Sequence, residues 1–225
     1  MKGLVLLYWG TVFLMYLSQT YYPVETQLDG CQIGRRHFML RRADIFMIIV
    51  IAWMTCFSFL RTSYNDTGNY IMYFRDSVPL SQYIDEGGLL DWTGKPLSLL
   101  YQHIVHELTD NYHIFFFFPA LLNSFAVVKL FKNYSVNPAF SLFLFFSVGT
   151  YVTYIAALKQ SIAIFFLILS IPYAEEKKYI KFYLLVFVAM LFHIHSFLFL
   201  ILPLLFGKPW NKTMLAFLAA AIFAL

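Results

Sequence analysis

Long apolar runs, many of them close to the length that crosses a membrane, limit what this chain can fold into. Hydrophobic residues make up 60% of the sequence and charged residues only 12%, whereas soluble domains carry about 25% charged residues. A soluble fold must cover much of its surface with polar groups, but a chain surrounded by lipid does not. Because a helix satisfies its own backbone hydrogen bonds in lipid, we predict an all-α membrane protein.

A helix that crosses a membrane needs about 20 predominantly apolar residues. The runs that approach this requirement are residues 3–22, 44–60, 112–131, 139–158, 160–173, 182–206 and 213–225. They predict a polytopic bundle of about six to seven transmembrane helices, which we assign to a single domain over residues 1–225. The last run ends within apolar sequence at Leu225, so we expect the chain to be incomplete at its C-terminus.

Residues 97–108 have a helical pattern but are too short and too polar to cross a membrane alone. They carry His103, His106 and Glu107. His103 and Glu107 share one face of a helix because they are four residues apart. We predict a re-entrant or interfacial helix whose polar face accounts for these side chains.

Basic residues gather in three of the segments that connect the apolar runs. They are Arg35, Arg36, Arg41, Arg42, Lys129, Lys132, Lys177, Lys178 and Lys181. Lys and Arg are enriched in cytoplasmic loops, so we predict that these segments are cytoplasmic and that residues 61–95 are extracytoplasmic. A segment as long as 61–95 exceeds a plain connection and is expected to carry function.

The first group of candidate site residues begins where the second apolar run ends, and it comprises Arg61, Asn65, Asp66, Thr67 and Tyr70. A guanidinium such as that of Arg61 can form two parallel hydrogen bonds to a phosphate. Asp66 is suited to accept a proton or to hold a sugar hydroxyl, and the ring of Tyr70 offers a flat face to a sugar. The alternative is an interfacial arginine followed by an Asn-Asp-Thr-Gly turn.

Two further candidates lie inside apolar sequence. Lys159 separates two apolar runs, and a charge there is costly unless it faces a cavity or a partner. The alternative is a lysine that reaches the membrane surface from a tight hairpin. His193 and His195 point to different faces of a helix, so they do not predict a shared metal site. One of them can act as an acid or base, and each can equally be a structural core histidine.

The sequence lacks the motifs that are typical of several classes of function. No nucleotide-binding, dinucleotide-binding or zinc-protease motif is present. Cys31 and Cys56 give neither a disulfide framework nor the spacing of a metal site. The net charge is only +4 and there is no dense basic tract, which argues against nucleic acid as a partner. We therefore predict no cofactor, no metal and no nucleic acid.

Three of these stretches resemble the EpsG family of bacterial exopolysaccharide membrane proteins, which is related to O-antigen polymerases of the Wzy type. The matching residues are Arg61 with Asn65-Asp66-Thr67 and Tyr70, then Ala157-Leu158-Lys159-Gln160-Ser161-Ile162-Ala163, and then Phe192-His193 with Ser196. The similarity covers most of residues 45–206. The chain departs from the family in having Lys159 where Arg is usual, and Lys95 where an acidic residue is frequent.

The resemblance implies a metal-independent glycosyltransferase in the bacterial cytoplasmic (inner) membrane, with multiple passes. It would polymerise polyprenyl-diphosphate-linked oligosaccharide repeat units into a surface or capsular polysaccharide. Arg61 and Lys159 would stabilise the diphosphate, and Asp66 or His193 would be the catalytic base. The expected partners are the lipid-linked glycan, the lipid bilayer and other polysaccharide assembly proteins.

Three other functions fit parts of the same sequence. A flippase for lipid-linked oligosaccharides would also need cations for the diphosphate, although such transporters usually show inverted repeats. A membrane O-acyltransferase would place a histidine in an apolar helix but gives no reason for the segment around Arg61. A structural or assembly subunit would need none of the candidate residues for chemistry.

Overall fold

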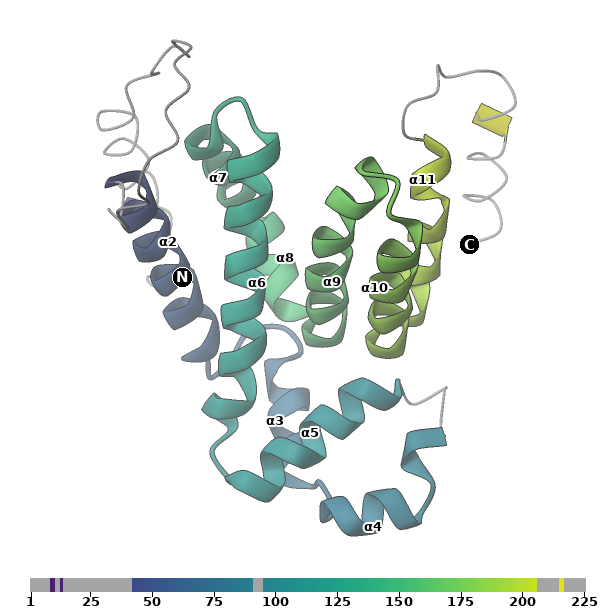
Figure 1. The fold of residues 1–225 in the computed structure, drawn as a ribbon. Coiled ribbons are helices and arrows are strands. Elements are labelled where there is room, and N and C mark those ends of the chain that lie inside the picture. The colour runs from purple at the N-terminus through teal and green to yellow at the C-terminus, as the bar shows by residue number, and fades with distance from the viewer. Residues whose placement is uncertain (1–8, 11–12, 14–41, 91–94, 206–214, 217–225) are drawn as a thin grey trace, which may run out of the picture. The chain divides into compact units, whose positions relative to one another are not determined.

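The computed structural model describes residues 9–10, 13, 42–90, 95–205 and 215–216, and all structural statements concern these residues (Figure 1). They form ten α-helices, two 3-10 helices and no strand, which confirms the predicted all-α class. The predicted helices at 3–22 and 213–225 lie almost wholly outside the described residues. So do Arg35, Arg36, Arg41 and Cys31.

The chain folds into two compact units, each built from two separate segments. The first unit contains Met1–Gly68 and Phe116–Ala156, and the second contains Asn69–Phe115 and Ala157–Leu225. The assignment of residues 1–225 to a single transmembrane domain stays a prediction.

The first unit contains α2 (Arg42–Phe59), most of α6 (Tyr112–Tyr134), α7 (Pro138–Ser147) and α8 (Thr150–Ala156). Its core joins α2 to the other helices through Met54, Val127, Leu142 and Tyr151, among other buried side chains. The hydroxyl of Tyr151 donates a hydrogen bond to the carbonyl oxygen of Met54 at 2.8 Å. Because this hydroxyl is satisfied, a tyrosine can be buried in the apolar core.

The prediction of one continuous helix over 139–158 is wrong, because α7 and α8 are separated at Val148 and Gly149. Gly149 has a φ of +78°, a left-handed conformation that glycine adopts without the penalty of a Cβ. The N–H groups of these two residues donate hydrogen bonds to carbonyl groups in the last turn of α7. Pro138 and the capping side chain of Asn137 begin α7.

The second unit contains two groups of helices. The first group is most of α3 (Thr67–Arg75), α4 (Leu80–Asp85), the 3-10 helix η1 (Gly88–Leu90) and α5 (Pro96–Leu108). The second group is α9 (Leu158–Glu175), α10 (Tyr179–Phe192), the 3-10 helix η2 (Ile194–Ile201) and α11 (Leu202–Leu205). α9 and α10 form a helical hairpin around the buried residues Ala174, Phe182 and Val186.

The prediction of one continuous helix over 182–206 is also wrong. α10 ends at Phe192, because His193 has an extended backbone with φ −152° and ψ 111°. The 3-10 helix η2 follows, and the N–H of Ser196 turns back to the carbonyl of His193 at 3.0 Å. The break between α10 and η2 therefore falls at His193, one of the predicted site residues.

The helix predicted over 97–108 is confirmed as α5, and its polar side chains hold the preceding segment. The ring of His103 stacks on Tyr83 with centroids 4.3 Å apart, and its Nδ1 lies 2.8 Å from the carbonyl oxygen of Val78. Glu107 accepts a hydrogen bond from the N–H of Leu80 at 3.2 Å. These contacts support a structural role for His103 and Glu107. The re-entrant or interfacial position of α5 stays a prediction.

Among the described residues, two helices are long and apolar enough to cross a membrane by length and composition. They are Tyr112–Tyr134 and Leu158–Glu175, and the shorter apolar helices are Met47–Phe59 and Tyr179–Phe192. The expected runs at 112–131 and 160–173 therefore appear as spans of sufficient length. The total of six to seven transmembrane helices stays a prediction.

Candidate functional site

Arg61 lies two residues after the end of α2, and its side chain is turned into the first unit. It is only 9% exposed. The guanidinium Nη1 donates a hydrogen bond to the carbonyl oxygen of Ile155 near the end of α8, and its Cζ lies 4.4 Å from the centre of the Phe116 ring. Carbonyl groups at a helix C-terminus and the face of an aromatic ring both attract cations. Arg61 is therefore positioned by the fold.

A pocket of about 550 Å³ opens beside Arg61 within the first unit. Its lining residues are Trp53, Cys56, Phe57, Leu60, Arg61, Thr62, Ser63, Tyr64, Val152 and Ile155. The α2 side of this pocket is mostly apolar, whereas Arg61, Thr62 and Ser63 supply polar groups. Such a lining suits an amphiphile that combines an apolar chain with an anionic group.

The sequence reasoning missed the apolar wall of this pocket, although a signal for it was present. Trp53, Cys56, Phe57 and Leu60 follow the i, i+3, i+4, i+7 spacing of one helix face. Arg61 comes directly after this face, so the apolar wall and the cation adjoin in the sequence as well. What the spacing alone does not reveal is that α8 supplies the other side through Val152 and Ile155.

The segment after Arg61 forms the turn that the alternative reading anticipated. The N–H of Thr67 donates to the carbonyl oxygen of Tyr64 at 3.0 Å. Tyr64 and Asn65 have φ values of +125° and +45°, and such backbone costs about 1–3 kcal/mol per residue. Strained residues of this kind concentrate at functional sites, so a turn and a binding role are compatible here.

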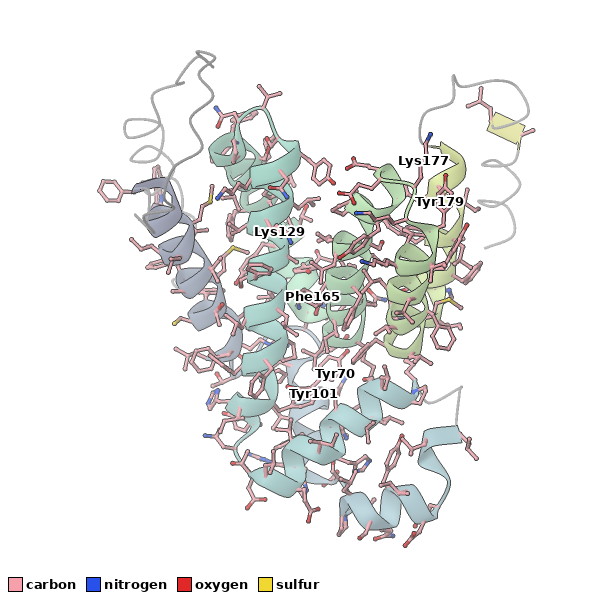
Figure 2. The ribbon with its side chains drawn as sticks, viewed as in Figure 1. Tyr70, Tyr101, Lys129, Phe165, Lys177 and Tyr179 are labelled. Atoms are coloured by element: carbon pink, nitrogen blue, oxygen red, sulfur yellow. The ribbon has the colours of Figure 1, made fainter. Side chains whose placement is uncertain are left out.

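The predicted site residues in and after this turn differ in exposure. The side chains of Asn65 and Asp66 are exposed, whereas Thr67 is fully buried at the start of α3. The Thr67 hydroxyl has no hydrogen-bond partner among the described residues. Tyr70 is half-buried on α3 (Figure 2). Asp66 and Asn65 are thus accessible to a substrate, and Thr67 is not.

Lys159 and His193 lie at the same end of the α9–α10 hairpin in the second unit. Lys159 is the second residue of α9, and only Ala157 separates α9 from α8. His193 follows the last residue of α10, and its ring centroid is 5.1 Å from that of His195. Both Lys159 and His193 are half-buried, and the positive charge of Lys95 acts on each of them. The structure thus brings these two predicted residues toward Lys95.

The seven predicted site residues are divided between the two units. Arg61, Asn65, Asp66 and Thr67 belong to the first unit, and Tyr70, Lys159 and His193 belong to the second. Their convergence on a single site stays a prediction. In the part of the chain that the structure describes, no three His, Cys, Asp or Glu side chains are grouped as metal ligands.

The described part of the chain is all-helical, and two of its helices are long and apolar enough to cross a membrane, which fits the class of helical membrane proteins. The model of the EpsG family matches residues 44–225, which is most of the chain. The chain therefore belongs to the EpsG family, whose members are membrane proteins of exopolysaccharide biosynthesis. Comparisons with curated proteins and with solved structures find no match. The resemblance drawn from the three sequence stretches is thus confirmed.

Proposed function

We propose that this protein polymerises polyprenyl-diphosphate-linked oligosaccharide repeat units into an exopolysaccharide. A hydroxyl oxygen of one repeat unit forms a bond to the anomeric carbon of the growing chain. The bond from that carbon to the diphosphate oxygen breaks, and polyprenyl diphosphate leaves with the electron pair. The proton of the hydroxyl passes to a base. The diphosphate is already an activated leaving group, so the reaction needs no nucleotide.

The pocket beside Arg61 is the observation that carries this proposal. An isoprenoid diphosphate has a long apolar chain and a compact anionic head. The apolar wall formed by Trp53, Phe57 and Leu60 suits the chain, and the guanidinium of Arg61 at the same pocket suits the head. Membership of the EpsG family supports a role in exopolysaccharide biosynthesis. The lining of the pocket supports a lipid-linked substrate for that role.

The remaining candidate residues take the roles that the reaction requires. Arg61 and Lys159 stabilise the negative charge that develops on the departing diphosphate. Asp66 or His193 accepts the proton of the attacking hydroxyl. The exposed carboxylate of Asp66 is the stronger candidate for the base, because it lies close in sequence to Arg61 and is accessible to a sugar. Asn65 and Tyr70 complete the proposed substrate-binding set, whereas the buried Thr67, also predicted from the sequence, is not accessible to a substrate.

A test combines deletion of the full gene with complementation by the wild type or by Asp66→Asn. Asp66 is exposed, so Asp66→Asn removes its basicity with little effect on folding. We expect single lipid-linked repeat units to accumulate on the outer face, with long polymer reduced at least about 100-fold, the lower range for loss of a general base. Protein level in the membrane is the control, and His193→Gln tests the other candidate base.

Other outcomes of the same experiment separate the competing functions. Repeat units trapped on the cytoplasmic face after deletion would identify a flippase, because transporters often contain helices that are broken as α10 is at His193. An unchanged glycan profile after deletion would overturn the polymerase proposal. Loss of polymer on deletion, with full activity in the Asp66, His193, Arg61 and Lys159 variants, would identify an assembly subunit.

A further inference from the structure

Three basic side chains gather at one end of the α9–α10 hairpin in the second unit: Lys95, Lys159 and His193. Lys95 immediately precedes α5, which packs against α10. Lys159 lies in the first turn of α9, which packs against both α10 and η2. His193 joins α10 to η2. Figure 1 shows the start of α5 beside the end of the hairpin at which α9 begins and α10 ends, so three segments that are distant in the sequence carry basic residues to this end.

The charges at this place have the same sign. The charge of Lys95 acts on Lys159 and on His193, and the ring of His195 lies 5.1 Å from that of His193 between centroids. Like charges held together in a partly buried setting repel one another. A bound anion would remove this repulsion.

The backbone adds positive potential at the same end of the hairpin. α5 and α9 both begin here, as does η2. None of the three has a side-chain hydrogen bond that caps its N-terminus. Uncapped N–H groups at a helix start attract anions, above all phosphate groups. The basic side chains and the helix N-termini therefore both favour the binding of an anion.

We propose that Lys95, Lys159 and His193 form a binding site for a phosphate-class anion, the diphosphate head of a lipid-linked substrate. The identity of the lipid rests on the proposed function, whereas the anion site rests on the charges described above. Lys95 is the new member of this set. In the sequence it was notable only because the EpsG family frequently has an acidic residue at this position. An ammonium group is a compact point charge that holds a phosphate without the fixed geometry of a guanidinium.

Binding to the purified full chain in detergent or nanodiscs tests the site without any assay of polymerisation. The probes are farnesyl diphosphate, inorganic pyrophosphate and uncharged farnesol. We expect farnesyl diphosphate to bind and its affinity to fall with rising salt. Lys95→Gln and Lys159→Gln should each weaken binding about tenfold, and Lys95→Arg, which keeps the charge, should largely preserve it. If farnesyl diphosphate binds more tightly than pyrophosphate, the anion that the site recognises belongs to a lipid. If the two bind equally, the site recognises a free phosphate compound.

Lys177→Gln is the matched control. Lys177 is an exposed lysine in the loop at the opposite end of the α9–α10 hairpin (Figure 2), about 20 Å away because α10 rises about 1.5 Å per residue. Its removal should leave binding unchanged. Wild-type affinity for farnesyl diphosphate in both Lys95→Gln and Lys159→Gln, with the variants monodisperse, overturns the proposal. So does farnesol binding as tightly as farnesyl diphosphate.

The outcomes for this site and for the polymerase are separable. If deletion of the gene leaves the polymer unchanged while Lys95→Gln and Lys159→Gln lose the probe, the polymerase proposal fails and the anion site stands. If deletion abolishes the polymer while both variants bind the probe like the wild type, the anion site fails and the polymerase proposal stands.

Discussion

Arg61 is a buried cation that makes several contacts within the first unit. Its guanidinium meets the carbonyl of Ile155 and the ring of Phe116, and it also borders the pocket. A buried cation without such contacts would be strongly unfavourable. The same side chain therefore has a structural role in the first unit and a proposed role toward the substrate, and an Arg61 variant has to be interpreted with both roles in mind.

We expect Arg61→Ala to lower the stability of the protein by about 1.5–3 kcal/mol, the range for a lost hydrogen bond to a charged group. Thermal unfolding of purified protein in detergent, with Arg61→Lys alongside, measures the effect. The control is Arg75→Ala, because Arg75 is exposed on α3 and should change stability by less than about 0.5 kcal/mol. Equal midpoints for Arg61→Ala and Arg75→Ala would contradict the structural role.

At the scale of elements, interrupted helices are the recurring feature. The run at 139–158 is broken at Gly149, and the run at 182–206 is broken at His193. The first break turns α8 so that Val152 and Ile155 line the pocket. The second places His193 at the end of the α9–α10 hairpin, where Lys159 also lies. Each break is next to one of the two candidate binding regions.

Gly149→Ala tests whether the first break depends on glycine. A Cβ at Gly149 would meet no atom within 4 Å, so its φ of +78° is the source of strain. We expect a loss of about 1–2 kcal/mol, the cost of left-handed backbone for an L-residue, and a lower unfolding temperature. Gly68→Ala is the control, because it also meets no atom within 4 Å and lies in helix α3 without a positive φ. It should be neutral or slightly stabilising.

At the scale of the whole molecule, the chain passes between its two units three times. The passages fall after Gly68, Phe115 and Ala156. The first lies inside the stretch from Arg61 to Tyr70, and the third lies next to the stretch around Lys159. Two of the three stretches that match the EpsG family are thus located where the units are joined. Because neither unit is continuous in sequence, removal of one by truncation would disrupt the other.

The predicted orientation in the membrane is tested by labelling of single cysteines. Ser81→Cys in α4 and Lys177→Cys between α9 and α10 are introduced into a chain with Cys31 and Cys56 replaced by Ser. Both positions are exposed. From the distribution of Lys and Arg, we expect a membrane-impermeant maleimide to label Ser81→Cys in intact cells and Lys177→Cys only after permeabilisation. Labelling of both positions from the same side would refute this orientation.

The sequence by itself determined the helical class, the family and the positions of α2, α5, α6 and α9. These properties depend on residues close together in the chain, because apolar periodicity and short motifs are local. The helix expected at 44–60, for example, appears as α2, and the one at 112–131 as α6. The turn after Arg61 was likewise anticipated from its Asn-Asp-Thr-Gly composition.

Only the tertiary structure decided how distant residues meet. Arg61 contacts a carbonyl 94 residues away, and Lys95 reaches Lys159 and His193 through the packing of α5 and α9 against α10. The breaks at Gly149 and His193 were missed because apolar composition continues through both, although the backbone does not. Such contacts depend on which helix faces pack together, and hydrophobic periodicity identifies an apolar face without identifying its partner.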